Sequence, residues 1–255
     1  MKLFIAKNIR NGDKKAFEVI KKQVLGKPDS LIGLAVGKTT DGLHKLISKD
    51  AIKNKKAWSR LKIFQIDENL GLKPTDPLSF NHEIKNELKS LIKLLPTKNI
   101  FLIDGKQNPR LIVSKGYNFI KKNNGIDLII LGIGPEYDPN IAYNTTGKST
   151  LNSRFRVVDL HPKIAEKIKA GKGLPRQTPT KGITLGIRDI LNSKKALLIA
   201  YGKEKANSLK IAFKKVNIKK SSASALLLHK DLVIVADKGA SSLISKSYNK
   251  AKEKI

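Results

Sequence analysis

Short apolar runs alternate along the chain with segments in which apolar residues recur at helical spacing. A continuous apolar run is typical of a strand that is buried on both faces, and helical spacing is typical of an amphipathic helix. Strands are therefore predicted at 31–36, 61–66, 100–103, 126–131, 183–187, 196–201, 223–228 and 232–236. Helices are predicted at 11–25, after 40, between 79 and 96, and at 109–122, 162–170 and 204–216. The alternation predicts an α/β fold with one largely parallel, doubly wound sheet and helices on both faces.

No internal repeat and no clear linker interrupts this pattern. The 255 residues, of which 40% are hydrophobic, can bury a sizeable core. We therefore expect one α/β domain over 1–255, ending in a basic C-terminal tail at 241–255. The stretch 135–182 is rich in Gly, Pro, Thr and Asn and carries few structural signals. So long a stretch in a compact domain usually serves function.

Basic residues outnumber acidic residues by 51 to 21, which gives a formal net charge of +30. Such a charge raises the hypothesis of nucleic-acid binding. Only seven of the basic residues are arginine, however, and arginine is the residue suited to bidentate recognition of phosphates and bases. The lysines are spread over every predicted helix, which favours an A/T-rich coding bias as the origin of the charge. Nonspecific binding of polyanions at low salt is expected in either case.

Several classes of site are disfavoured by what the chain lacks. Without cysteine there are no disulfides, thiolate metal sites or cysteine nucleophiles. The four histidines show no metal-ligand spacing, so neither a metal nor another cofactor is predicted: His44, His82, His161 and His229. No apolar run approaches the roughly 18 residues of a membrane span, and the N-terminal run is too short for a signal peptide. We expect a cytoplasmic protein without a membrane partner; a homo-oligomer stays open.

Two adjacent carboxylates, Asp67 and Glu68, follow directly after the predicted strand 61–66. Ligands of open α/β sheets bind just beyond the carboxyl ends of the strands, so a carboxylate here is well placed to act as a base. Acidic residues after a strand also commonly form turns or cap the next helix. The residues alone leave both interpretations open.

Three glycine-containing turns also follow predicted strands. The first, Gly33 to Thr39, resembles a Walker A loop but is one residue short, which disfavours an NTPase. Gly37, Lys38, Thr39 and Thr40 can still offer backbone N–H groups and hydroxyls to a single phosphate, unless a threonine simply caps the helix. Gly132 and Gly134 lack the third glycine of a dinucleotide-binding fingerprint. They form a tight turn that either lets a ligand approach the backbone or binds no ligand. Lys205 lies in the first turn of a predicted helix after the third turn; either an anion bound there offsets its unfavourable charge, or its position is chance in so lysine-rich a chain.

These pieces occur together, in this order, in the sugar-phosphate isomerase/deaminase group. The chain resembles glucosamine-6-phosphate deaminases and the related 6-phosphogluconolactonases from about residue 31 to 240. The resemblance is carried by the phosphate loop at 34–40, by 64–72 with 76–80, by 127–134 with 141–144, by 182–186 and by the turn at 202–205. It implies a Rossmann-like sheet similar to that of CoA-transferases. The segment Gln65 to Asn69 resembles the deaminase branch more than the lactonase branch.

The resemblance also implies roles. Asp67 would move a proton between C2 and C1 of an amino-sugar phosphate, which is general acid–base work. Gly37, Lys38, Thr39, Thr40 and Lys205 would hold the 6-phosphate. The substrate would also contact three further residues: Glu68, Gly132 and Gly134. An allosteric phosphate site is matched loosely by Ser149, Arg154 and Arg156.

This chain lacks the ring-opening motif of the family, Asp-Gly-His. The segment reads Gly134-Pro135-Glu136-Tyr137-Asp138-Pro139-Asn140, about two residues longer, and Asn140 stands where the histidine is expected. An asparagine has no titrating nitrogen with which to shuttle a proton. Glu136 or Asp138 would have to replace the aspartate, and a threonine replaces the glutamate that follows.

The leading hypothesis is therefore a deaminase that converts glucosamine 6-phosphate and water to fructose 6-phosphate and ammonia in amino-sugar catabolism. Its partner is a phosphorylated sugar. A non-catalytic sugar-phosphate sensor on the same fold is an alternative, because the histidine is lost. A 6-phosphogluconolactonase is another.

Overall fold

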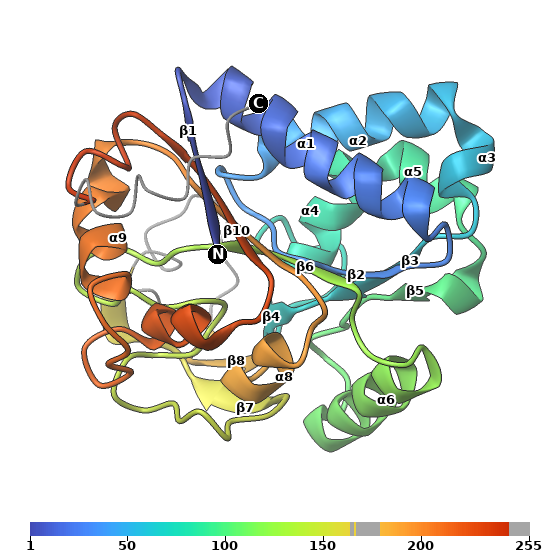
Figure 1. Ribbon diagram of the computed structural model, residues 1–255. Coiled ribbons are helices and arrows are strands. Elements are labelled where there is room, and N and C mark those ends of the chain that lie inside the picture. Colours follow the sequence, from blue (N-terminus) through green and yellow to red (C-terminus); the bar gives the residue numbers. More distant parts are fainter. Residues whose placement is uncertain (164–165, 167–178, 245–255) are drawn as a thin grey trace.

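A twisted sheet of seven parallel strands runs through the molecule, in the order β1-β10-β9-β6-β2-β3-β5 (Figure 1). The computed structural model describes residues 1–163, 166 and 179–244. The chain winds outward from β2 through β3 to β5, then crosses to the other side of β2 and continues through β6, β9 and β10. This order confirms the predicted α/β fold with a doubly wound, parallel sheet.

The elements fall close to the predicted positions where the apolar pattern is strong. The strands of the main sheet are β1 (Lys2–Ala6), β2 (Leu31–Leu34), β3 (Lys62–Gln65), β5 (Ile100–Phe101), β6 (Leu128–Gly132), β9 (Ala196–Ala200) and β10 (Leu232–Asp237). The helices are α1 (Ile9–Gly26), α2 (Asp41–Lys53), α3 (Lys55–Trp58), α4 (Phe80–Glu87), α5 (Lys89–Leu94), α6 (Pro109–Lys122), α8 (Ile187–Leu191) and α9 (Ala206–Ala212). Short 3₁₀ helices are η1 (Thr97–Asn99), η2 (Lys203–Lys205) and η3 (Ser222–Leu228).

Helices cover both faces of the main sheet, which is why its strands read as unbroken apolar runs. Figure 1 shows α1 and α2 on one face and α6 and α8 on the other. In β6, Leu128 and Ile130 pack toward α1 and α2, while Ile129 and Leu131 pack toward α6 and α8. All four side chains are fully buried. Each such burial stabilises the fold by about 1.5–3 kcal/mol, so the two cores hold the strand ends in fixed positions.

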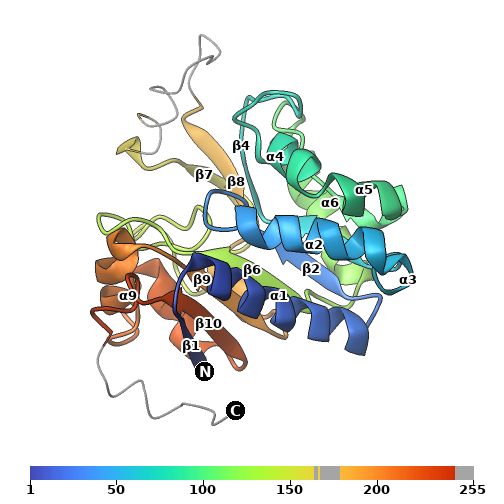
Figure 2. The ribbon, with the colours of Figure 1, turned by 90° about the horizontal axis from the view of Figure 1, so that it is seen from above.

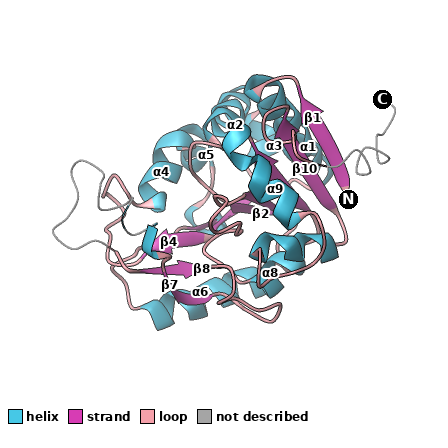
Figure 3. Cartoon of the chain, turned by 90° about the vertical axis from the view of Figure 1, so that its left-hand side faces the viewer, coloured by secondary structure: helices cyan, strands magenta, loops and turns pink. Residues whose placement is uncertain are grey.

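A second, three-stranded antiparallel sheet stands apart from the main one and was not apparent in the apolar pattern (Figure 3). It consists of β4 (Asp67–Asn69), β8 (Lys181–Thr184) and β7 (Arg156–Asp159), in the order β4-β8-β7. Thr184 pairs with Asp67 on one side and with Arg156 on the other. This small sheet therefore connects the segment after β3 to the long segment before β8.

Three predicted elements need correction. The run 223–228 belongs to the 3₁₀ helix η3 and is not a strand. Ser222 and Ser224 donate side-chain hydrogen bonds to backbone carbonyls, which favours turns over strands. The helix predicted between 79 and 96 is interrupted at Leu88 into α4 and α5. The strand predicted at 183–187 ends at Thr184 and gives way to α8.

Two other predictions extend beyond the described part of the chain. Most of the helix predicted at 162–170 lies outside the described residues, and so does the tail beyond 244. No helix in the described part of the chain combines the length and apolar character that a bilayer crossing demands.

An aromatic cluster ties the small sheet to the main one and offers a test of the packing. Phe155, which precedes β7 and is 2% exposed, meets the ring of Phe64 in β3 edge-on at 5.6 Å. Phe155→Ala is expected to lower the free energy of unfolding by about 3–5 kcal/mol, because it leaves a cavity between the sheets. Urea unfolding measures this loss. The same change at the exposed Tyr137 is expected to cost far less, and equal losses would contradict the proposed role of Phe155.

Candidate active site

The predicted site residues converge at the carboxyl edge of the main sheet. The winding direction reverses between β2 and β6, and in open α/β sheets this reversal point is where ligands bind. The turn 35–40 follows β2, the turn 133–140 follows β6, and the turn 201–205 follows β9, the next strand along. The predicted phosphate loop, the altered ring-opening segment and the Lys205 turn therefore meet at one edge, above which β4 begins.

Asp67 lies at the start of β4, directly beyond the carboxyl end of β3, and is only 8% exposed. Burial, with smaller contributions from the charges of Glu68 and Glu83, raises the pKa of Asp67 to about 8. A carboxyl with such a pKa holds a proton at neutral pH and is a strong base once ionised. This property suits a group that takes a proton from carbon and returns it.

Glu68, predicted from the sequence to contact substrate, instead directs both carboxylate oxygens at protein donors. Its side chain is fully buried. Oε1 accepts hydrogen bonds from the backbone N–H groups of Asn69 and Phe80, and Oε2 accepts from Ser79 Oγ, Asn81 N–H and Gln65 Nε2, all within 2.8–3.0 Å. Glu68 therefore anchors the first turn of α4 under β4. These bonds give Glu68 the helix-capping geometry, which was one of the two interpretations of the carboxylate pair.

Gln65 is a positioning residue that the sequence analysis did not single out. It is fully buried, and its Nε2 donates to the Asp67 carbonyl at 2.8 Å as well as to Glu68. Its Oε1 accepts from the backbone N–H of Ile103 at 2.8 Å. Gln65 thus clamps the turn that aims Asp67. A polar residue inside an otherwise apolar strand is the sequence signal that could have identified it.

The predicted phosphate loop has the expected turn, but only some of its side chains are accessible to a ligand. Gly37 has φ +127°, a conformation that favours glycine. Thr40 is buried and donates its hydroxyl to the Gly37 carbonyl at 2.9 Å, without forming a side-chain cap on α2. Lys38 is exposed and Thr39 is half-buried, so these two side chains are the accessible ones. A Gly37 backbone hydrogen bond reaches the Glu83 carboxylate, so this acid shares the loop with any anion.

Lys205 reaches across from the β9 turn to the β6 turn. Its Nζ donates to the Ile133 carbonyl at 2.7 Å, which brings the ammonium group between Gly132 and Gly134. Gly134 is required by packing, because a β-carbon there would overlap Asn140 Oδ1 and the Asp138 carbonyl. The structure therefore brings together Lys205 and the two glycines, as the sequence implied.

The altered ring-opening segment folds into a closed loop. Asn140 Nδ2 donates to Asp138 Oδ2 at 2.8 Å, and the Thr146 backbone N–H donates to Asp138 Oδ1 at 2.9 Å. Asp138 and Asn140 are 1% and 5% exposed, whereas Glu136 is exposed. Of the two acids offered as substitutes for the family aspartate, Asp138 is therefore the one inside the loop.

Tyr143 is a further residue of the site that the sequence analysis did not list among its functional residues. It is 9% exposed, its hydroxyl donates to Asn69 Oδ1 at 2.8 Å, and its ring lies 5.8 Å from that of Phe80. Burial and the neighbouring charges of Asp67 and Glu68 raise its pKa, so it stays a neutral donor. Its place in the 141–144 motif was the available signal.

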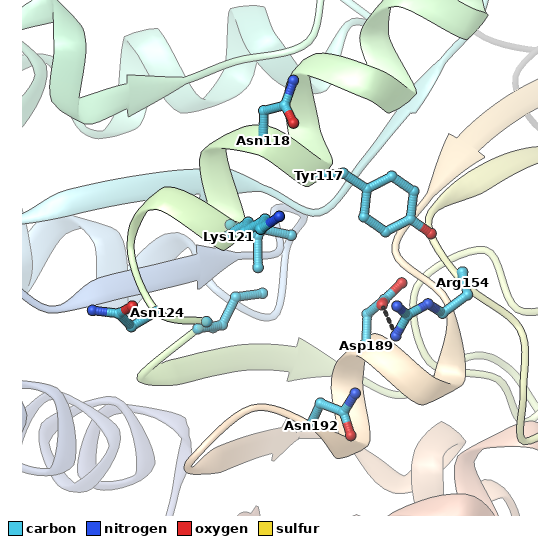
Figure 4. Close-up of a pocket in the computed structure, with 10 residues that line it drawn as sticks. Tyr117, Asn118, Lys121, Asn124, Arg154, Asp189 and Asn192 are labelled. Carbon is cyan, nitrogen blue, oxygen red and sulfur yellow. Dashed lines mark ion pairs between the residues drawn. The ribbon is translucent and has the colours of Figure 1, made fainter.

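The three residues of the predicted allosteric site separate into two pockets. Ser149 and Arg156 line a cavity of about 180 Å³ that Tyr143 also borders, and Arg156 Nη2 donates to Ser149 Oγ at 2.9 Å. Arg156 is two strands from Asp67 across the small sheet, or about 10 Å. Arg154 instead lines another cavity, of about 460 Å³, where it pairs with Asp189 at 3.2 Å below Tyr117 (Figure 4).

Comparisons with known proteins identify relatives of this chain. No family model matches the chain. A glucosamine-6-phosphate deaminase of Clostridium botulinum (strain Loch Maree / Type A3) is 35% identical over 96% of this chain and 99% of its own. One from Thermoanaerobacter sp. (strain X514) is 33% identical over 96% of this chain and 95% of its own.

Solved structures give the same result. A monomeric glucosamine-6-phosphate deaminase superposes with a TM-score of 0.85 at 25% identity, covering 95% of this chain and all of that one. The 6-phosphogluconolactonase of Trypanosoma cruzi shares the fold, with a TM-score of 0.75 at 17% identity over 96% of this chain and 97% of its own. Fold and site thus define an α/β protein of the sugar-phosphate isomerase/deaminase class. Within it, this chain belongs to the glucosamine-6-phosphate deaminase family.

Proposed function

We propose that this protein converts glucosamine 6-phosphate and water to fructose 6-phosphate and ammonia. The observation that carries the proposal is the buried Asp67 carboxyl at the carboxyl edge of the sheet, on a turn whose backbone carbonyl is held by Gln65. The identity to glucosamine-6-phosphate deaminases over nearly the whole chain supports the same reaction.

Asp67 acts as the base. In the open-chain amino sugar it takes the proton from C2 and returns it to C1, so the C1 aldehyde becomes an alcohol and the amine at C2 becomes an imine. Water then adds to C2, and ammonia leaves as the C2 ketone forms. Tyr143 supports this step by holding Asn69, the residue that ends β4, in place. Binding the remote phosphate orients the reacting carbons over Asp67.

The phosphate is held by Gly37, Lys38, Thr39 and Lys205. Lys205→Met is expected to raise KM for glucosamine 6-phosphate by about 10- to 100-fold, since one charge-assisted hydrogen bond is worth about 1.5–3 kcal/mol. Steady-state kinetics measures the change. Lys210→Met removes an exposed lysine from the same segment of chain and serves as the matched control. An unchanged KM in Lys205→Met would remove this lysine from the phosphate site.

Ring opening is assigned to Asp138, with Asn140 holding its carboxylate in position. Because Asn140 cannot titrate, a second function deserves the same test: a sugar-phosphate sensor that binds without turnover. Incubation with glucosamine 6-phosphate, with ammonia and fructose 6-phosphate followed in time, separates the two. Turnover supports the deaminase. Thermal stabilisation by the sugar phosphate without turnover supports the sensor. If the protein shows neither turnover nor stabilisation, both hypotheses are contradicted. In an active but slow enzyme, Asn140→His is expected to raise the rate.

The remaining expectations follow the same assignment. A lactonase is the weaker reading, since the lactonases share the fold at low identity. Ser149 and Arg156 are proposed to bind an allosteric phosphate without Arg154, which lies in the other cavity. A cytoplasmic setting agrees with a metabolic reaction of this kind, and the homo-oligomer stays a prediction.

A further inference from the structure

A buried acid on α1 lies between two of the turns at the carboxyl edge of the main sheet. Asp13 is only 6% exposed, although aspartate is almost always exposed unless it is paired. Helix α1 packs against both α2 and β9, and Figure 2 shows it alongside α2. Asp13 therefore reaches the segments that follow β2 and β9, the two strands whose turns carry the proposed phosphate ligands.

On one side, the Asp13 carboxyl touches the first turn of α2. A β-carbon at Gly42 would overlap Asp13 Oδ2, so only glycine lets the two segments approach this closely. The first turn of α2 is in turn tied to the phosphate loop. Thr40 donates to the Gly37 carbonyl from its backbone N–H at 2.8 Å and from its hydroxyl at 2.9 Å. A shift of this turn would therefore move the phosphate loop with it.

On the other side, Asp13 and its neighbour Gly12 meet Tyr201, the first residue after β9. Tyr201 is 5% exposed, and a β-carbon at Gly12 would overlap its phenol ring. Burial raises the pKa of Asp13, and the nearby Tyr201 hydroxyl partly opposes this effect. Asp13 Oδ1 and the hydroxyl form no hydrogen bond of standard geometry within the described residues, so shape and packing hold this contact together.

The two turns that Asp13 touches belong to strands that are not neighbours. Strand β6 lies between β2 and β9, so the ends of β2 and β9 are about 10 Å apart. We propose that Asp13 is a positioning residue for the substrate phosphate: its side chain fills the space between Gly42 and Tyr201 and sets the spacing between the phosphate loop and Lys205. This inference rests on the proposed function. It adds to that function a residue that acts through its neighbours and does not touch the phosphate.

Removal of the side chain tests this role. Asp13→Ala is expected to raise KM for glucosamine 6-phosphate by about 10- to 100-fold and to change kcat by less than about threefold, because misplaced phosphate ligands weaken binding while Asp67 keeps its position. Asp13→Asn keeps the size of the side chain, so its KM is expected to stay within about threefold of the native value. Steady-state kinetics measures both.

Two further variants separate positioning from stability. Gly42→Ala places a β-carbon against Asp13 and is expected to raise KM as well, in a helical position that favours alanine. Because both changes act on one contact, the Gly42→Ala/Asp13→Ala double variant is expected to raise KM by less than the product of the single effects. Ser193→Ala removes a buried hydroxyl before β9, at the amino edge of the sheet, and is expected to lower Tm with KM unchanged.

Calorimetric titration with glucosamine 6-phosphate measures binding without turnover. Asp13→Ala is expected to weaken this binding about as much as it raises KM. If the native chain binds no sugar phosphate, the proposed function and the positioning role both fail. If the native chain binds it and folded Asp13→Ala and Gly42→Ala bind it equally well, only the positioning role is overturned. Weaker binding in Asp13→Ala supports that role even in a native chain that binds without turnover.

Discussion

Asp67→Asn is expected to lower kcat for glucosamine 6-phosphate by about 10²- to 10⁴-fold, the usual contribution of a positioned general base. The amide keeps the shape of the side chain and the Gln65 clamp, which bonds the Asp67 carbonyl, not its carboxyl. KM is therefore expected to change little. Ammonia release under steady-state conditions measures the effect. Undiminished turnover in Asp67→Asn would mean that another group moves the proton.

The same carboxyl sets an expected pH dependence. Because the pKa of Asp67 is raised to about 8, the ionised base is a minority at neutral pH, and kcat/KM is expected to rise with pH and level off above about 8. Stability changes in the opposite direction. Between the ordinary pKa of 3.8 and about 8 the folded chain binds more protons than the unfolded chain, so the free energy of unfolding falls as pH rises.

Asp67→Asn removes the titrating carboxyl. It is therefore the control for the pH profiles of both kcat/KM and stability. Across pH 4 to 8 its free energy of unfolding is expected to fall less than that of the native chain, because it lacks the carboxyl that titrates. Urea unfolding at several pH values compares the two. Parallel stability profiles in the native and variant chains would show that the pKa of Asp67 is not raised.

Glu68→Gln is expected to lower the free energy of unfolding by about 3–5 kcal/mol, a cost typical of breaking a buried, charge-assisted network. The carboxylate accepts five hydrogen bonds, and the amide NH₂ of glutamine would face donors where an acceptor is required. For a chain of this size the loss corresponds to a fall in Tm of about 10 °C. Thermal and urea unfolding measure it.

Glu18→Gln is the matched control for this stability prediction. Glu18 is exposed and pairs only with the nearby Lys15 in the described structure, so its loss is expected to cost less than about 1 kcal/mol. If Glu68→Gln proved as mild as Glu18→Gln while losing substrate affinity, the result would support the predicted substrate contact by Glu68.

Strong local patterns made much of this fold predictable. Continuous apolar runs such as 128–131 are typical of strands buried on both faces, so they predict parallel strands with helices on either side. Gly37 and Lys205 each lie in a turn that follows a strand. Because parallel strands end at the same edge of a sheet, both turns lie at its carboxyl edge. The asparagine at position 140, where the family has a histidine, was also visible from the sequence alone.

Contacts between distant segments could not be read in the same way. The small sheet pairs Asp67 with Thr184 and Thr184 with Arg156, and strands this short carry no periodic signal. The separation of Arg154 from Arg156 follows from their neighbours: Asp189 pairs with Arg154, and Ser149 bonds Arg156. Sequence spacing of two residues could not indicate that they line different cavities.

The sequence by itself determined the α/β class, the order of the strands' turns and the presence of an acid pair after a buried strand, because these depend on local periodicity and residue type. Only the tertiary structure decided the surroundings of each acid. Asp67 is left with a raised pKa beside the phosphate loop, while Glu68 is occupied by donors from α4.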